Sequence, residues 1–340
     1  AEDRELDYRF RHHLSYAIGH GVGATWGPDR PVREISTDAL PTESVRPVRA
    51  LSSSDPTLGM AWLADDAVEP LDLARRLGHF ADSYGEWIAG QRAEAGSAHP
   101  EHRDIAAEIV NRMDQTLDRI RAGIDLLARD ETVRRAFRIA NRAMLMQSVG
   151  PQNPDPTWRP FQLAFILMAL PSTVDSSHDG RGLVDLIWFP TGGGKTEAYL
   201  GLAAIEMVHR RLARGMDGGG TAVITRYTMR LLTAQQFQRA ARLVCALEIL
   251  RGQDDALRGA APFSIGLLLG NSTTPSSFKD AQKQLDDVRR QQTPQNPFQV
   301  RTCPWCGTLL MPPRRSARDD AYGFRATTRS FAINCINEDC

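Results

Sequence analysis

The chain has 340 residues, 42% of them hydrophobic and 24% charged, as is ordinary for a soluble globular protein with room for two or three domains. Its 41 Lys and Arg residues equal its 41 Asp and Glu residues, so any DNA-binding surface must be local. The longest apolar runs are too short to span a membrane and no signal peptide opens the chain, which predicts a cytoplasmic protein without a membrane partner.

The first 150 residues are predicted to be mainly helical after a mixed start. Alternating Val22, Ala24 and Trp26 predict one strand of a small β-rich module. From Pro70 to about Met146, apolar residues recur at steps of three and four, as on one face of a helix. The first two apolar stripes comprise Leu73, Leu77, Phe80, Tyr84 and Ile88, and then Ile105, Ile109, Met113, Leu117, Ile120, Ile124 and Leu127.

A third helix is predicted to begin at Asp130, whose carboxylate suits an N-cap. Four arginines give this helix a basic face, which we interpret as solvated, although contact with DNA or a partner stays open. They are Arg134, Arg135, Arg138 and Arg142. The breaker-rich stretch from Gly150 to Pro156 then marks a domain boundary.

Strand and helix patterns alternate after this boundary. The apolar residues from Trp158 to Leu170 predict a helix that begins with the tetrapeptide RPFQ. Buried strands are predicted over residues 183–189, over residues 221–225, and from Phe263 toward a polar loop that ends at Pro275.

The stretch from Leu183 to Leu200 carries the clearest chemistry. Its apolar run enters a turn with glycine at positions 192–194, and Lys195 and Thr196 then begin a helical pattern. This order of strand, loop and helix is the context of a phosphate-binding P-loop. The glycines lack Cβ atoms, so their backbone N–H groups can surround a polyphosphate. Lys195 would reach the β- and γ-phosphates, and Thr196 would hold Mg²⁺.

Four cysteines form two pairs late in the chain, Cys303 with Cys306 and Cys335 with Cys340. Two thiolate pairs suit a tetrahedral Zn²⁺ site, and the CPWCG turn has the form of a zinc knuckle. Four thiolates leave no open coordination position, which favours a structural role. The wider spacing of the second pair leaves an iron–sulfur cluster or free thiols open. Such a cysteine pattern suits a reducing cytoplasm better than a disulfide framework does.

The succession RPFQ, FPTGGGKTEAYL, ITRYTMRLLTAQQFQRA and CPWCG resembles the helicase subunit of DISARM-type bacterial anti-phage systems, within helicase superfamily 2. The segments GHGV and AFRIANRAM extend the resemblance over most of the chain. Phe189 stands where the strict P-loop pattern has its first glycine, and this departure is the form that motif I takes in superfamily 2.

The resemblance implies individual contacts for ATP and for DNA. Phe161 would pack on adenine, and Gln162 would hydrogen-bond its edge. The nucleotide contacts are then Arg159, Phe161, Gln162, Pro190, Thr191, Gly192, Gly193, Gly194, Lys195, Thr196 and Glu197, with Lys195 and Thr196 in the catalytic role. Motif Ia supplies contacts to the phosphate backbone of DNA that is single-stranded or has a single-stranded end: Thr225, Arg226, Arg230 and Gln235.

The resemblance also implies an α/β fold and a motor function. Residues 151–297 would form the first part of a RecA-like P-loop ATPase domain with a parallel sheet. Residues 1–150 would be an accessory domain, and residues 298–340 a zinc-binding insertion. The implied function is that of an ATP-dependent DNA helicase or translocase that acts with a defence-system partner subunit against phage DNA.

The sequence departs from the helicase pattern in one respect. The acidic pairs nearest to a DExH box are Asp286–Asp287 and Glu338–Asp339, and neither follows a predicted buried strand. We therefore expect the chain, which begins at Ala1 and stops on Cys340, to be a piece that binds nucleotide weakly and hydrolyses little. Two other functions stay open: an ATPase switch or assembly platform that binds DNA without unwinding it, and a zinc-dependent DNA-binding scaffold with a vestigial P-loop.

Overall fold

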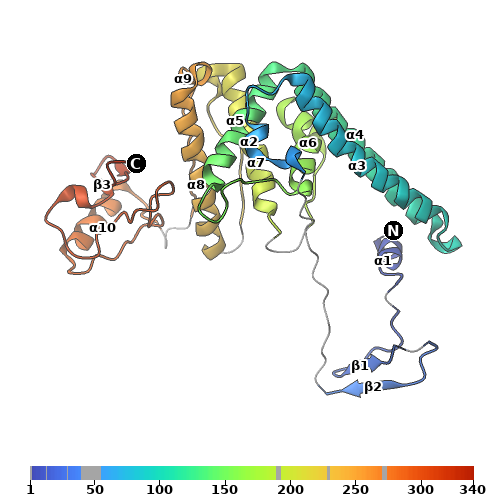
Figure 1. The fold of residues 1–340 in the computed structure, drawn as a ribbon. Coiled ribbons are helices and arrows are strands. Elements are labelled where there is room, and N and C mark those ends of the chain that lie inside the picture. The colour runs from blue at the N-terminus through green and yellow to red at the C-terminus, as the bar shows by residue number, and fades with distance from the viewer. Residues whose placement is uncertain are drawn as a thin grey trace.

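The computed structural model describes residues 2–12, 14–28, 30–39, 55–188, 193–227, 230–269 and 274–340. Helices dominate this part of the chain (Figure 1). They are α1 (Glu2–Arg9), α2 (Met60–Leu63), α3 (Pro70–Gly96), α4 (Arg103–Arg129), α5 (Glu131–Ser148), α6 (Pro160–Val174), α7 (Lys195–Arg214), α8 (Arg230–Gln253), α9 (Asp255–Arg258) and α10 (Phe278–Arg290). The strands are β1 (Gly23–Trp26), β2 (Ile35–Asp38), β3 (Phe324–Ala326) and β4 (Phe331–Ile333).

The three helices predicted from apolar periodicity are confirmed as α3, α4 and α5. Helices α3 and α4 form a long hairpin (Figure 1), and buried residues such as Leu77 and Ile120 line its inner side. The predicted cap is also confirmed, because the Asp130 carboxylate accepts a hydrogen bond from the Val133 amide at 2.9 Å. Its capping bond therefore helps the chain to end α4 and begin α5 at this residue.

A central bundle forms where α4, α5, α6, α7 and α8 pack together, and one cluster of buried side chains runs through it from Leu58 to Phe263. Trp158, just before α6, is 2% exposed. Its indole N–H donates to Asn141 Oδ1 at 2.8 Å, and the Asn141 amide donates to the Phe137 carbonyl at 2.8 Å. A buried polar pair that is satisfied in this way fixes the position from which α6 begins.

The predicted RecA-like parallel sheet is wrong. The described residues contain two sheets, each a pair of antiparallel strands, β1 with β2 and β3 with β4. A strand at residues 22–26 is confirmed as β1, but the stretches 183–188, 221–225 and 263–268 form no strand. Apolar side chains in these stretches face solvent, among them Val184 at 94% exposure and Leu268 at 97%.

The error has a physical cause. A buried strand needs a neighbour for its backbone N–H and C=O groups, and none of the three stretches has one among the described residues. Arginines attach each stretch to a helix instead. Arg119 of α4 pairs with Asp185 through bonds of 2.7 and 2.9 Å, and Arg210 of α7 donates to Thr221. The Arg211 guanidinium, also of α7, lies over the Phe263 ring at 4.5 Å from its centre. The apolar pattern indicated strand-forming residues but carried no information about a partner.

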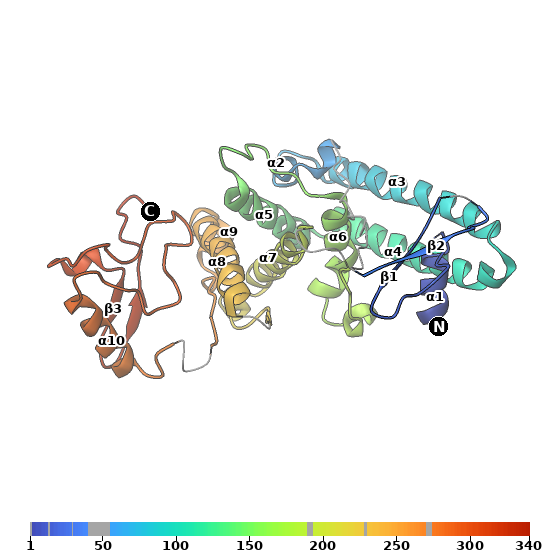
Figure 2. The same cartoon turned by 90° about the horizontal axis from the view of Figure 1, so that it is seen from below.

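The C-terminal residues form a second, smaller core beside α8 and α9 (Figure 2). Helix α10 packs on the β3–β4 hairpin, and the rings of Phe298 and Phe324 lie 4.7 Å apart between them. Trp305 is half-buried and packs against both the central cluster and this one. No helix in the described part of the chain combines the length and apolarity needed to cross a membrane.

Two glycine substitutions test the packing of α4 against α6. A Cβ on Gly123 would lie 2.0 Å from the Leu167 carbonyl oxygen, so Gly123→Ala must separate the helices and should lower the free energy of unfolding by more than about 2 kcal/mol. A Cβ on Gly90, in the middle of α3, meets nothing within 4 Å. Gly90→Ala should therefore stabilise the protein by about 0.5–1 kcal/mol. If urea unfolding gave the same change in the free energy of unfolding for both variants, the close contact between α4 and α6 would be contradicted.

Candidate functional site

The predicted phosphate-binding turn leads into α7 through Gly193 and Gly194, whereas Pro190, Thr191 and Gly192 lie outside the described residues. Gly194 has a φ of 86°, in the left-handed region that favours glycine, and it stands at the N-cap of α7. Glycine has no side chain, so the N-cap residue itself makes no side-chain capping bond. The positive end of the α7 dipole therefore lies at this turn.

The N-terminus of α6 holds this turn in place. Arg159 Nη1 donates to the Gly193 carbonyl oxygen at 2.6 Å, and Gln162 Nε2 donates to the Gly194 carbonyl oxygen at 2.6 Å. Gln162 Oε1 also accepts from the Arg159 backbone N–H at 2.7 Å. The RPFQ element and the glycine turn therefore meet, although 32 positions separate Gln162 from Gly194. We call these contacts the α6–α7 joint.

The adenine contacts expected of the RPFQ element stay predictions. Gln162 is 4% exposed, and both the oxygen and the nitrogen of its amide are engaged in the α6–α7 joint. Reading a base edge would require at least one of these bonds to exchange for a bond to adenine.

Side chains of the first turn of α7 reach two neighbouring segments. Thr196 Oγ1 accepts a hydrogen bond from the Tyr199 hydroxyl at 3.1 Å, and the Tyr199 oxygen lies 2.7 Å from that of Tyr227. Glu197 forms an ion pair with Arg239 of α8. Sequence reasoning missed Tyr199, Tyr227 and Arg239; only the three-residue step from Thr196 to Tyr199 could have indicated a contact.

Charged side chains of both signs lie around the start of α7. Arg159 contacts the turn, Arg239 pairs with Glu197, and Lys195 is the first residue of the helix. A Cβ on Gly194 would lie 3.5 Å from Glu197 Oε2 and 3.7 Å from Arg159 Nη1, so the two side chains converge on the turn. A helix N-terminus with the basic side chain of Arg159 beside it fits a polyphosphate anion.

The predicted DNA contacts lie close to α7 or on α8. Thr225 and Arg226 are exposed and directly precede Tyr227, which contacts α7 through Tyr199. Gln235 is exposed on α8, and the side chain of Arg230 lies outside the described residues. DNA binding by these residues stays a prediction.

The structure brings together the four cysteines of the predicted metal site. The Sγ atoms of Cys303 and Cys340 lie 3.8 Å apart, those of Cys306 and Cys335 lie 3.5 Å apart, and all four lie within 4.8 Å of one another. A tetrahedral zinc with Zn–S bonds of about 2.3 Å places its sulfurs about 3.8 Å apart. The four thiols therefore fit a metal ion such as Zn²⁺.

Backbone hydrogen bonds of the knuckle hold Cys303 in place. The Cys303 N–H donates to the Thr308 carbonyl at 2.8 Å, and Gly307, with a φ of 76°, closes the turn onto the Cys303 carbonyl. Hydrogen bonds with the Thr308 side chain and backbone lower the pKa of the Cys306 thiol to about 6. Burial raises the pKa of Cys335, and raises that of Cys340 further. A divalent cation would offset the cost of gathering four thiolates.

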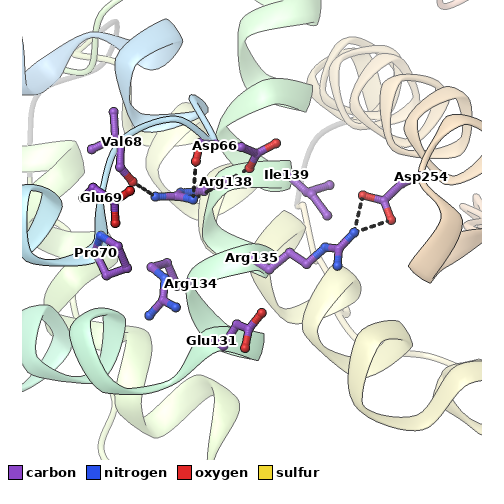
Figure 3. A pocket seen from close by; sticks show the side chains of 10 residues that line it. All are labelled: Asp66, Val68, Glu69, Pro70, Glu131, Arg134, Arg135, Arg138, Ile139 and Asp254. Atoms are coloured by element: carbon purple, nitrogen blue, oxygen red, sulfur yellow. Dashed lines mark hydrogen bonds and ion pairs between the residues drawn. The ribbon is translucent and has the colours of Figure 1, made fainter.

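The basic face of α5 is neither simply solvated nor a demonstrated DNA contact, because its arginines bind other parts of the chain. In Figure 3, Arg138 donates to the Val68 carbonyl and Arg135 pairs with Asp254 at 2.9 and 3.1 Å. Arg134 bonds the carbonyls of Leu127 and Ala128 at the end of α4. The adjoining cavity of about 280 Å³ also contains carboxylates, so its charge is mixed.

No protein-family model matches the chain. In a comparison with curated proteins, the chain is 31% identical over 376 aligned positions to a protein of Bacillus paralicheniformis named "DISARM protein DrmA". The alignment covers 98% of this chain and 32% of that protein, so the chain spans about a third of the length of its relative. The likeness to a DISARM protein expected from the motifs thus extends over nearly the whole chain, whereas the relative's name does not mention helicase activity.

Metal analysis tests the cysteine site. We expect the purified protein to carry about one zinc per chain, Cys303→Ser to lose it because three thiolates remain, and Cys245→Ser, a half-buried cysteine of α8, to retain it. Mass spectrometry of the metals measures the content, and visible absorption detects an iron–sulfur cluster. Equal zinc in the two variants would rule out this ligand set.

Proposed function

We propose that the chain binds the triphosphate of ATP at the start of α7 and acts as a DNA-dependent ATPase of superfamily 2 in defence against phage. The observation that carries the proposal is the α6–α7 joint, because it unites two separate motifs at the N-terminus of α7. Backbone N–H groups and Lys195 would bind the phosphates, and Thr196 would hold Mg²⁺.

The defence role rests on a different observation, the similarity to a DISARM protein over 98% of this chain. We propose that ATP hydrolysis drives a helicase or translocase that works with a partner subunit of the defence system. Exposed Thr225, Arg226 and Gln235, together with Arg230, would contact the phosphate backbone of DNA. Such contacts read no base sequence, so the choice of target would depend on other features. The cysteine site would hold Zn²⁺ in a structural role.

Hydrolysis of ATP by the full-length protein, with and without single-stranded DNA, tests the proposal. We expect DNA to stimulate hydrolysis, and Lys195→Ala to lower the stimulated rate by about 100-fold or more, because a charge that stabilises the transferring phosphoryl group is lost. Lys279→Ala, an exposed lysine of α10, is the matched control and should leave the rate unchanged. A rate of ATP hydrolysis that DNA does not change would favour an ATPase switch. If the wild type hydrolyses no ATP, the assignment as an ATPase is refuted.

A further inference from the structure

A chain of three hydroxyl groups connects the start of α7 to the segment that follows Arg226. Thr196, Tyr199 and Tyr227 supply its oxygens, which are separated by 3.1 Å and 2.7 Å in that order. Tyr199 donates its proton to Thr196. Because a phenol has one proton, Tyr227 is the donor in its bond to Tyr199. The two tyrosine hydroxyls therefore donate one after the other toward Thr196, which accepts.

The hydrogen bonds between these three oxygens can also run in the opposite direction, with donors and acceptors exchanged. If Thr196 donates to Tyr199 and Tyr199 donates to Tyr227, every proton stays on its own oxygen and the hydroxyl groups only rotate. Thr196 Oγ1 then keeps both lone pairs for a cation, and the Tyr227 hydroxyl becomes available to donate outward. The chain of hydroxyls has two arrangements that differ at both of its ends.

Both tyrosines are half-buried, and Tyr227 directly follows the exposed pair Thr225 and Arg226. Burial, and then the hydrogen bond with Tyr199, raises the pKa of Tyr227 above its usual value. Its hydroxyl therefore keeps its proton around neutral pH, as a donor must.

A second contact leads from the same turn of α7 to the other predicted DNA element. Glu197 pairs with Arg239 of α8, and Gln235 precedes Arg239 by four residues, so the two side chains share one face of that helix. The first turn of α7 thus has a link to each of the two segments expected to contact DNA.

We propose that the hydroxyls of Tyr199 and Tyr227 couple nucleotide binding at Thr196 to phosphate binding beside Thr225 and Arg226. With a cation on Thr196, the hydroxyl chain takes the outward direction, and a DNA phosphate oxygen accepts the proton of Tyr227. Coupling of two sites is reciprocal, so DNA strengthens nucleotide binding by the same factor. The inference rests on the proposed function, and it makes Tyr199 and Tyr227 positioning residues.

Binding measurements with phenylalanine variants test the coupling. The dissociation constant for a fluorescein-labelled single-stranded oligonucleotide is measured with and without Mg²⁺ and a non-hydrolysable ATP analogue. In the wild type, the analogue should tighten DNA binding by roughly fivefold or more. Tyr199→Phe, Tyr227→Phe and the double variant should all reduce this factor to near one, since any one loss interrupts the chain. Tyr84→Phe, a half-buried tyrosine of α3 whose ring stacks on Trp87, is the matched control.

The outcomes separate the coupling from the function on which it rests. Both single variants should still bind the analogue alone and unfold at the wild-type temperature, because each loses only a hydroxyl. Variants that retain the wild-type factor would overturn the coupling and leave the proposed function intact. A wild type that binds both ligands without any mutual effect would overturn it too. If the wild type binds neither the analogue nor DNA, the proposed function fails, and the coupling fails with it.

Discussion

Two hydrogen bonds between the start of α6 and the glycine turn position the rest of the candidate site. They join Arg159 and Gln162 to the carbonyls of Gly193 and Gly194. Their anchor is the core, because Trp158 directly precedes Arg159 and is held by Asn141. A site supported by packed helices keeps its geometry better than one built on loops alone.

Close packing against Trp158 determines how near α7 lies to the start of α6. A Cβ on Gly201 would lie only 2.7 Å from the Trp158 ring, so a glycine at this position lets α7 approach the indole. The first turn of the same helix carries Thr196, which accepts a hydrogen bond from Tyr199, and Glu197, which pairs with Arg239 of α8. One rigid element therefore connects the core, the candidate nucleotide site and the candidate DNA segments.

Features that depend on residues close to one another in the sequence could be predicted from it. The α3 and α4 stripes, the Asp130 cap and the start of α7 follow from local spacing and turn chemistry, and the cysteine pairs follow from ligand spacing. The parallel sheet could not be predicted reliably, because the sequence of an apolar stretch such as residues 221–225 does not indicate which other strand it would pair with. The roles of Tyr227 and Arg239 depend on contacts across 28 or more positions, for which a single sequence carries no signal. The arginines of α5 show the same limit, because their charge was evident and their partners were not.

Amide hydrogen exchange tests the central claim, that the turn held by the α6–α7 joint binds polyphosphate. We expect Mg²⁺ and ATP to slow exchange of the backbone amides at residues 193–197, which include the turn that the α6–α7 joint holds. Helix α3, which packs on α4 on the side away from this turn, should exchange at an unchanged rate and serves as the internal reference. Unchanged exchange at residues 193–197 under saturating ATP, or protection confined to the cysteine site, would contradict the account.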